Sequence, residues 1–425
     1  MEKVLSQTFV PNVALVASFD CEDVYKNKLL NQKEPILAQS GYPIRVQGLL
    51  QLDSKPEPLD VEQLVRSACS HGIEDYAKVQ PKLIEEVVTE TTLGRRAQSY
   101  ETWGHPLASI LVVSSENGNP ISALTQLYQQ SYAELPQHIS ADCLRCVLYV
   151  EIESDQAKGG EDFETVHAQF GPYCYKIDGI EALETGLITI AQDSVYPYLD
   201  NVMRAWQESG NSKRSNSFGF GKLLKKLVNS GPPRPENNLF ADVCRSMQPH
   251  VASIPARRPE VNLDMQFRRL ADIAFMVKNY TLANSAYDSL RKTFSATQRW
   301  AELGAASEMT AVTAAIIMLS PSDVIHAVDS AMYTYNSRIH SYAHALRCAL
   351  LTSICLVDKG DQLLAAEILS MALMDINPIL GSGVHPAQTA MLMEELSLAY
   401  ARKGWNRKVR LWKKLAAAEW ESVKA

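Results

Sequence analysis

The 425-residue sequence lacks the features of several protein classes. It has no uninterrupted apolar run of about 18 residues, which a membrane-spanning helix needs. Its first ten residues, MEKVLSQTFV, mix polar and apolar side chains, unlike the continuous apolar stretch of a signal peptide. Its eight cysteines are scattered along a long chain without the spacing of a disulfide framework. These absences predict a cytoplasmic protein with reduced thiols.

Positive charge is also scarce. The chain has 41 Lys and Arg against 48 Asp and Glu, a formal net charge of -7, whereas nucleic-acid-binding proteins are usually basic. Apolar residues make up 46% and charged residues 21% of the chain, which is typical of a globular protein. The length exceeds what one ordinary core accommodates, so two or three domains are expected, without nucleic acid as a partner.

Signatures of catalysis are missing as well. The nearest candidate for a phosphate-binding loop, Gly221-Lys222-Leu223, lacks the first glycine of that motif, because Asn216 occupies its position. It also lacks the hydroxyl that would hold magnesium. No Gly-x-Ser-x-Gly elbow is present, so a hydrolase has no support. The sequence therefore predicts a protein that is not an enzyme, with no catalytic residue, cofactor or metal.

Two small clusters could hold a metal ion or a redox centre. Cys143 and Cys146 form a lone CxxC pair at the start of an expected strand. Zinc needs four ligands and a redox pair needs a helix N-terminus, so two partly buried cysteines are favoured. His340 and His344 are spaced one helical turn apart, but no third ligand is near, which favours surface or interface histidines.

The first half of the chain alternates short apolar runs with amphipathic stretches. Strands are expected at residues 10–17, 42–52, 107–113, 146–152 and 173–177, and helices at 20–30, 59–68, 121–133 and 159–170. This alternation predicts an α/β domain with a largely parallel sheet over residues 1–208. Its last helix should bury one apolar face, made of Val195, Leu199, Val202, Met203 and Trp206.

The last part of the chain is purely helical in pattern. Its helices are interrupted at residues 278–280, 320–322, 358–360 and 402–404, about 40 residues apart. That period predicts an all-α, TPR-like helical-repeat solenoid over residues 241–425. The last helix carries Trp405, Trp412 and Trp420, so we expect an uncapped apolar surface at the end of the solenoid.

A basic amphipathic segment lies between the two parts, in a linker over residues 209–240. At 100° per residue its apolar side chains share one arc and its lysines lie opposite. No acidic residue occurs from Asn211 to Gly231. This pattern predicts an interfacial membrane anchor, the alternative being a helix that packs on its own protein or on a partner. The expected membrane-binding residues are Phe220, Lys222, Leu223, Leu224, Lys225, Lys226, Leu227 and Val228.

A second basic stretch occupies residues 402–414. Its helical stripe of Trp405, Val409, Trp412 and Ala416 favours packing on a neighbouring solenoid helix over a membrane or acidic-partner surface.

Several segments, in the same order along most of the chain, resemble one known family. They are residues 9–14 (FVPNVA), 105–115 (HPLASILVVSS), 217–220 (SFGF) with the lysine-rich helix after it, and 268–275 (RRLADIAF) followed by Tyr280, Ala283 and Tyr287. The family is the large subunit specific to the TRAPP III form of the Transport Protein Particle complex, called subunit eight in animals. Family members are typically far longer than this chain.

The resemblance implies a scaffold subunit of a vesicle-tethering complex that exchanges guanine nucleotide on a Rab GTPase in ER–Golgi traffic and autophagy. Other TRAPP subunits would be its direct partners and the Rab an indirect one. The family's membrane-binding helix would map onto Phe220, Leu223, Leu224, Leu227 and Val228, which implies a peripheral location on Golgi and early secretory membranes. The alternative is a soluble helical-repeat adaptor without membrane contact.

Overall fold

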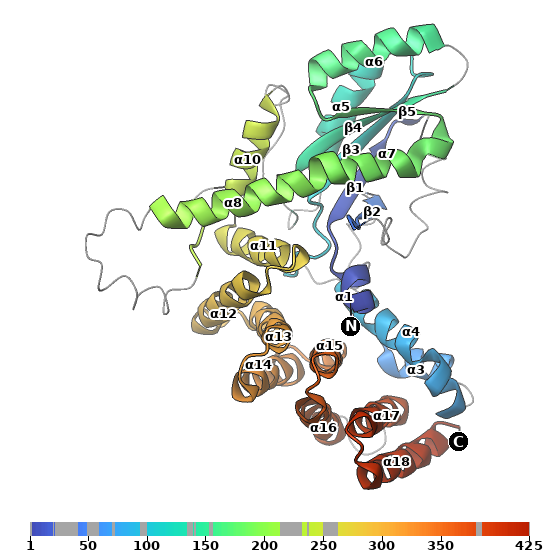
Figure 1. Ribbon diagram of the computed structural model, residues 1–425, viewed down its shortest axis with the longest axis vertical. Coiled ribbons are helices and arrows are strands. Elements are labelled where there is room, and N and C mark those ends of the chain that lie inside the picture. The colour runs from blue at the N-terminus through green and yellow to red at the C-terminus, as the bar shows by residue number, and fades with distance from the viewer. Residues whose placement is uncertain are drawn as a thin grey trace. The chain divides into compact units, whose positions relative to one another are not determined.

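The computed structural model describes residues 2–19, 21, 41–48, 59–69, 73–93, 100–133, 139, 142–152, 156–212, 232–235, 238–249, 262–379 and 385–424. The chain forms two compact units (Figure 1). The helical unit comprises residues 1–4, 56–101 and 279–425. The α/β unit comprises residues 5–55 and 102–278.

The α/β unit is built on a five-stranded sheet whose strands are all parallel. Its order is β2-β1-β3-β4-β5, and the central strand β3 is buried along its whole length because parallel sheets are covered on both faces. The predicted parallel sheet is thereby confirmed. The strands are β1 (Asn12–Ala17), β2 (Arg45–Gly48), β3 (Ala108–Ser114), β4 (Leu144–Glu151) and β5 (Cys174–Asp178).

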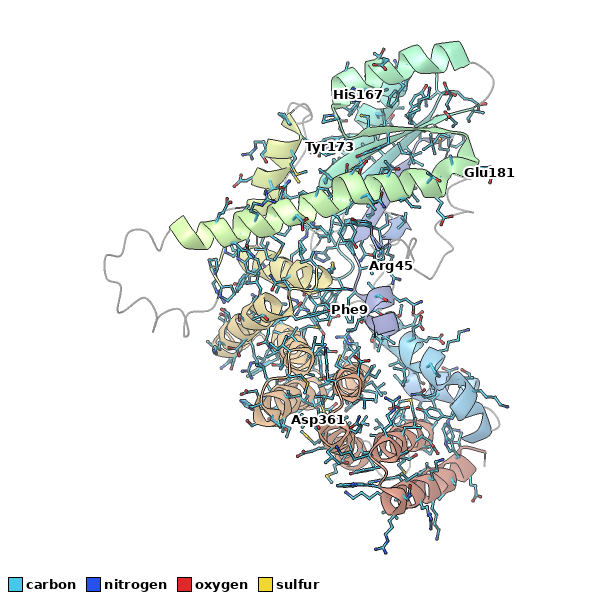
Figure 2. All side chains as sticks on the ribbon, viewed as in Figure 1. Phe9, Arg45, His167, Tyr173, Glu181 and Asp361 are labelled. Atoms are coloured by element: carbon cyan, nitrogen blue, oxygen red, sulfur yellow. The ribbon has the colours of Figure 1, made fainter. Side chains whose placement is uncertain are left out.

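Helices cover both faces of this sheet. On one face, α5 (Pro120–Ala133) and α6 (Gln156–Phe170) supply Leu124, Tyr128, Val166 and other side chains to a core with Leu111 and Val147 of the strands. On the other face lies α7 (Leu183–Ile190), where a Cβ on Gly186 would stand only 2.7 Å from a methyl carbon of Ile177 on β5. Side chains of the strands and the helices lie between these layers (Figure 2).

A long helical stretch and two further helices complete the α/β unit. A π-turn, η4 (Ala191–Val195), leads from α7 into α8 (Tyr196–Ser212), and all five members of the apolar face predicted there are buried. Both α10 (Leu239–Met247) and α11 (Leu263–Met276) contact α8. Arg269 of α11 donates to the backbone oxygens of Pro106 and Asp142 at 2.8 and 3.0 Å. These bonds attach α11, whose sequence resembles a first solenoid repeat, to the α/β unit.

The helical unit contains the predicted solenoid, in which each helix packs on the next. The four predicted interruptions all separate two helices. The elements are α12 (Tyr280–Ala296), α13 (Trp300–Ile316), α14 (Pro321–Tyr333), the π-turn η6 (Thr334–Arg338), α15 (Tyr342–Asp358), α16 (Gln362–Ile379), α17 (Pro386–Arg402) and α18 (Asn406–Lys424).

Most of the turns between these helices place a residue in the left-handed region. Gly360 and Gly404 have φ of 91° and 77° after α15 and α17, as glycine allows without cost. Lys278, Gln298 and Met318 adopt φ of 62°, 56° and 57° at the equivalent places after α11, α12 and α13. One type of turn, an αL residue closing the helix, therefore recurs along the helices from α11 to α17.

Two helices in the helical unit come from the first half of the chain. These are α3 (Val61–Ala68), which begins after the N-cap Asp60, and α4 (Ile73–Thr92); α1 (Glu2–Thr8) precedes β1. In sequence α3 and α4 lie between β2 and β3, yet they pack on α15, α17 and α18. The domain boundaries predicted from sequence are 1–208, 209–240 and 241–425. They stay a prediction, because each compact unit combines segments that are separated in the sequence, and such units do not test boundaries between contiguous segments.

Candidate functional site

The membrane-binding residues predicted in the linker, from Phe220 to Val228, lie outside the described residues, as does Gly221-Lys222-Leu223. Their role therefore stays a prediction. None of the helices described here is long and apolar enough to cross a membrane. In the same described ranges, no three His, Cys, Asp or Glu side chains gather as a metal site would require.

The carboxyl edge of the sheet is where an α/β fold usually binds a ligand. In nucleotide-binding folds a phosphate loop lies at the place where α5 begins here. In this chain Asn119 caps the start of α5, because its Oδ1 accepts a hydrogen bond from the Ser122 amide at 3.0 Å. Pro120 supplies no amide at the next position. Beyond β3, Ser115 Oγ accepts from the Ile152 amide at 2.9 Å, and Lys176 pairs with Glu151 at 2.8 Å. These described polar groups tie strand ends to one another.

The CxxC pair is structural in character. Both Cys143 and Cys146 are buried, more deeply than expected, and all eight cysteines are free thiols. Burial raises the pKa of the Cys146 thiol to about 12, which opposes thiolate formation at neutral pH.

The two histidines do not lie on one helix. His340 lies in the turn between η6 and α15 with φ of 53°, is exposed, and contacts the Asn336 oxygen through Nδ1 at 3.0 Å. His344 lies in the first turn of α15, is buried, and its Nδ1 contacts Ser341 Oγ at 2.6 Å. The turn between η6 and α15 separates the two histidines, so one is exposed and the other is buried.

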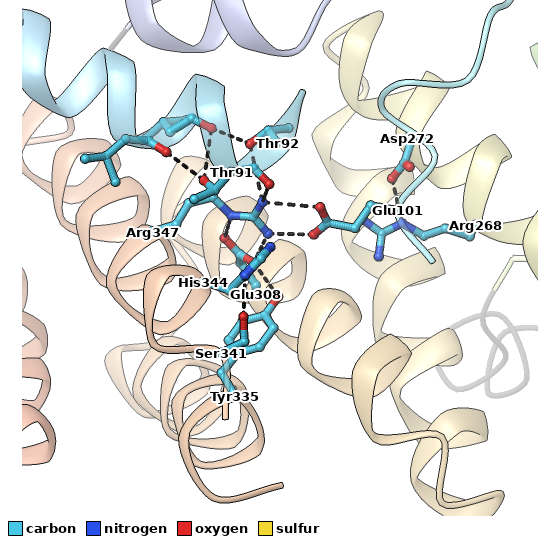
Figure 3. A network of polar contacts seen from close by, with 12 residues as sticks. Thr91, Thr92, Glu101, Arg268, Asp272, Glu308, Tyr335, Ser341, His344 and Arg347 are labelled. Carbon is cyan, nitrogen blue, oxygen red and sulfur yellow. Dashed lines mark hydrogen bonds and ion pairs between the residues drawn. The ribbon is translucent and has the colours of Figure 1, made fainter. Parts of the chain in front are cut away.

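His344 lies beside a polar cluster of the helical unit that is centred on Arg347 (Figure 3). Arg347 Nε and Nη2 donate to Glu308 of α13 at 2.7 and 2.6 Å. Nη2 and Nη1 donate to Glu101 at 2.6 and 3.2 Å, and Nη1 also donates to the Thr91 oxygen at 2.9 Å. Tyr335 Oη donates to Glu308 at 2.6 Å. We call these five residues the Arg347 network.

Charge balance in the Arg347 network explains its protonation states. Burial opposes ionisation of Arg347, but the carboxylates of Glu101 and Glu308 outweigh it and raise the pKa of the guanidinium well above its ordinary value. Burial first, and then the positive charge of Arg347, lower the pKa of His344 to about 4. At neutral pH His344 is therefore uncharged, beside one cation and two anions.

The Arg347 network joins the segment that follows α4 to the solenoid. Thr91 lies in the last turn of α4 and Glu101 lies beyond that helix, whereas Glu308, Tyr335 and Arg347 come from α13, η6 and α15. The sequence patterns did not predict this network. A signal was present, since Glu308 and Arg347 each stand alone as a charge in a long apolar stretch, and a charge in such a place is normally paired.

A second set of contacts joins α3 and α4 to the last helices of the solenoid. Glu62 of α3 accepts from the amides of Ala387 and Gln388 at 3.1 and 3.0 Å, at the start of α17. Tyr76 of α4 donates to Glu395 of α17 at 2.5 Å, and its ring lies 5.9 Å from that of Trp420 on α18. Trp420 is therefore buried, so the expectation of an uncapped apolar end was wrong for this tryptophan.

The second basic stretch forms most of α18. As predicted, α18 packs on α17, with Ala416 buried and Val409 and Trp412 half-buried. Trp405 is 42% exposed and stacks on Tyr400 with ring centroids 5.8 Å apart. The remaining polar side of α18 faces solvent.

Comparison with known proteins shows the family of the chain. The family model described as the ER-Golgi trafficking TRAPP I complex 85 kDa subunit, TRAPPC-Trs85, matches residues 51–183 and 177–359. Two Schizosaccharomyces pombe proteins, transport protein particle subunits trs85-1 and trs85-2, are 23% and 24% identical over 257 and 336 residues, 57% and 65% of this chain. Human trafficking protein particle complex subunit 8 is 33% identical over 174 residues, 41% of this chain.

The matches cover 37% and 52% of the two Schizosaccharomyces pombe proteins and 12% of the human one, so the chain spans about half or less of these relatives. The family match extends over strands of the α/β unit and over helices of the helical unit alike. The resemblance drawn from the sequence is confirmed, and the chain belongs to the Trs85 family of TRAPP complex subunits.

Proposed function

We propose that this chain is a non-catalytic scaffold subunit of a TRAPP-type complex that tethers vesicles and exchanges guanine nucleotide on a Rab GTPase. The observation that carries the proposal is the family match, which reaches across both units. Other TRAPP subunits are its proposed partners, and the Rab is reached through them. The proposed location is cytoplasmic and peripheral on Golgi and early secretory membranes, in ER–Golgi traffic and autophagy.

The chemistry of the described residues supports a scaffold rather than an enzyme. The α5 N-terminus is capped by Asn119, and the CxxC thiols are buried. The charged side chains in the Arg347 network are saturated by one another rather than directed at solvent. Titration of the full chain with labelled GTP tests this part of the proposal: stoichiometric binding would contradict it.

Membrane targeting is assigned to the basic amphipathic segment with Phe220, Leu223, Leu224, Leu227 and Val228. Burial of a large apolar side chain contributes roughly 1.5 to 3 kcal/mol, which suffices for reversible interfacial binding. The opposite lysines, Lys222, Lys225 and Lys226, would add a preference for anionic lipid that weakens with salt.

Vesicle flotation of the full chain tests the assignment. Leu223→Asp with Leu227→Asp should strongly reduce flotation on vesicles that contain phosphatidylserine, and Lys225→Glu with Lys226→Glu should reduce it mainly on anionic vesicles. A matched control places aspartates at Met318 and Met374, exposed at 53% and 69% in the helical unit. Full flotation of the Leu223/Leu227 variant would favour the alternative, a helical-repeat adaptor that does not touch membrane through this segment.

A further inference from the structure

One side of α18 combines cations with exposed leucines. At 100° per residue Arg407, Arg410, Leu411, Lys414 and Leu415 lie within an arc of about 140°, opposite the buried Ala416 and Trp420. Leu411 is 53% exposed and Leu415 39% exposed. We call these five residues the outward face of α18. It faces away from α17, because α17 contacts the opposite side.

The cations of the outward face have no acidic partner among the described residues. No carboxylate occurs in the sequence from Leu396 to Ala418, while seven Lys and Arg occur there, in a chain whose formal net charge is -7. Neighbouring cations are engaged: Lys408 lies 4.5 Å from the centre of the Tyr400 ring. Burial raises the pKa of Glu394 and of Glu395, and the positive charges of Lys413 and Arg402 respectively oppose that rise. Among the described residues, Arg407, Arg410 and Lys414 are exposed and directed at solvent.

We propose that the outward face of α18 binds the anionic surface of a lipid membrane. Its charge is of one sign, and its two leucines are of the size that enters the headgroup region. The surrounding stretch is rich in lysine, with Lys403, Lys408, Lys413 and Lys414, whereas lysine is depleted in protein–protein interfaces. An acidic protein segment is therefore the less favoured occupant.

The outward face of α18 is separate from the linker segment, and its proposed membrane binding does not depend on that segment. Two weak contacts on one chain raise the overall affinity, because the second contact forms at high effective concentration. The outward face should therefore act together with the linker segment on one membrane if both can reach it, and alone if the linker segment is disabled.

The test is vesicle flotation of the full chain carrying Leu223→Asp and Leu227→Asp, so that any residual binding cannot come from the linker segment. The vesicles are phosphatidylcholine with or without phosphatidylserine. In this background we expect salt-sensitive binding to the anionic vesicles only. Adding Arg407→Glu, Arg410→Glu and Lys414→Glu should weaken that binding by roughly 100-fold, at about fivefold or more per cation.

A matched triple variant, Lys78→Glu, Lys82→Glu and Lys359→Glu, changes net charge equally at exposed positions elsewhere in the helical unit and should retain binding. Leu411→Ser with Leu415→Ser tests the apolar contribution without changing charge, and thermal unfolding of each variant verifies its fold. Equal loss in both triple variants, or no loss in the α18 variant, would overturn the proposal. Loss of a co-purifying acidic protein with unchanged flotation would assign the face to a protein instead.

Discussion

Arg347 and Glu308 form a two-pronged ion pair, with Nε to Oε1 at 2.7 Å and Nη2 to Oε2 at 2.6 Å, inside the apolar interior of the helical unit. Both side chains are almost fully buried, at 3% and 1% exposure. A buried pair of this kind adds little net stability, because its desolvation offsets its attraction. We expect its effect to be on specificity, since Glu101 and Thr91 meet their partners only when their segment lies in one position.

Removal of Arg347 alone should be severely destabilising. Arg347→Leu leaves Glu101 and Glu308 buried without a cation, which should lower the free energy of unfolding by about 3 to 5 kcal/mol. Urea unfolding followed by circular dichroism measures this loss. Arg338→Leu, which removes an exposed arginine stacked on Trp300, is the control and should have a small effect. If Arg347→Leu proved as mild as the control, the carboxylates would not be held charged.

Acid should weaken the helical unit through His344. Its pKa is lowered from 6.5 to about 4 in the folded protein, so the unfolded chain binds the proton more readily. The stabilisation is complete above pH 6.5 and is lost as pH falls toward 4. The free energy of unfolding of the wild type should fall between pH 7 and pH 4. In His344→Gln, whose side chain cannot titrate, this fall should be smaller by roughly 2 to 3 kcal/mol. Urea titrations of both proteins across that range measure the difference, and parallel pH curves would contradict the prediction.

At the left-handed turns, introducing a glycine should stabilise the protein and removing one should destabilise it. Gln298 has φ of 56° and Gly360 φ of 91°, each just after a helix. Gln298→Gly should raise the free energy of unfolding by up to about 1 kcal/mol, because a non-glycine residue is strained in this region. Gly360→Ala should lower it by about 1 kcal/mol, although no atom lies within 4 Å of the added Cβ. Thermal and urea unfolding of the two variants should therefore shift oppositely, and a shift in the same direction would count against it.

Glu62 should act as the missing cap of α17. The N-cap residue of α17, His385, makes no side-chain cap hydrogen bond, and Glu62 accepts from the amides of Ala387 and Gln388 instead. Glu62→Ala should cost about 1 to 3 kcal/mol of stability. Glu62→Gln keeps one acceptor without the charge that suits a helix N-terminus, so it should cost less. Hydrogen exchange at Ala387 and Gln388 reports the loss locally. Equal exchange in both variants and wild type would refute the capping role.

The sheet was readable because its strands are short apolar runs bounded by turn residues. Residues 107–113 predicted β3, and Asn117 to Pro120 marked the turn before α5. The solenoid was readable from its period, since each interruption carries turn residues such as Gly360. The proposed membrane-binding segment was recognised only by its basic amphipathic pattern, and its function stays a prediction.

Long-range packing was not readable. The pattern of α3 is that of any amphipathic helix, and nothing in its local sequence indicates that it packs on α17 rather than on the sheet. Pro81 within α4 obscured that helix, because proline normally ends a helical pattern. The Arg347 network depends on three segments that are up to 256 residues apart, so only the lone charges in apolar helices hinted at it.

The order of synthesis gives the insertion of α3 and α4 a further consequence. Glu62 and its partner Gln388 are 326 residues apart in the chain. At roughly 5 to 20 residues per second, α17 leaves the ribosome about 15 to 65 s after α3. During that interval α3 has no α17 to pack on, and α4, whose Leu83, Val87 and Val88 are buried in the folded protein, has no α18. The nascent chain should therefore engage chaperones in this window, and a ribosome stalled before α17 would hold α3 accessible to protease.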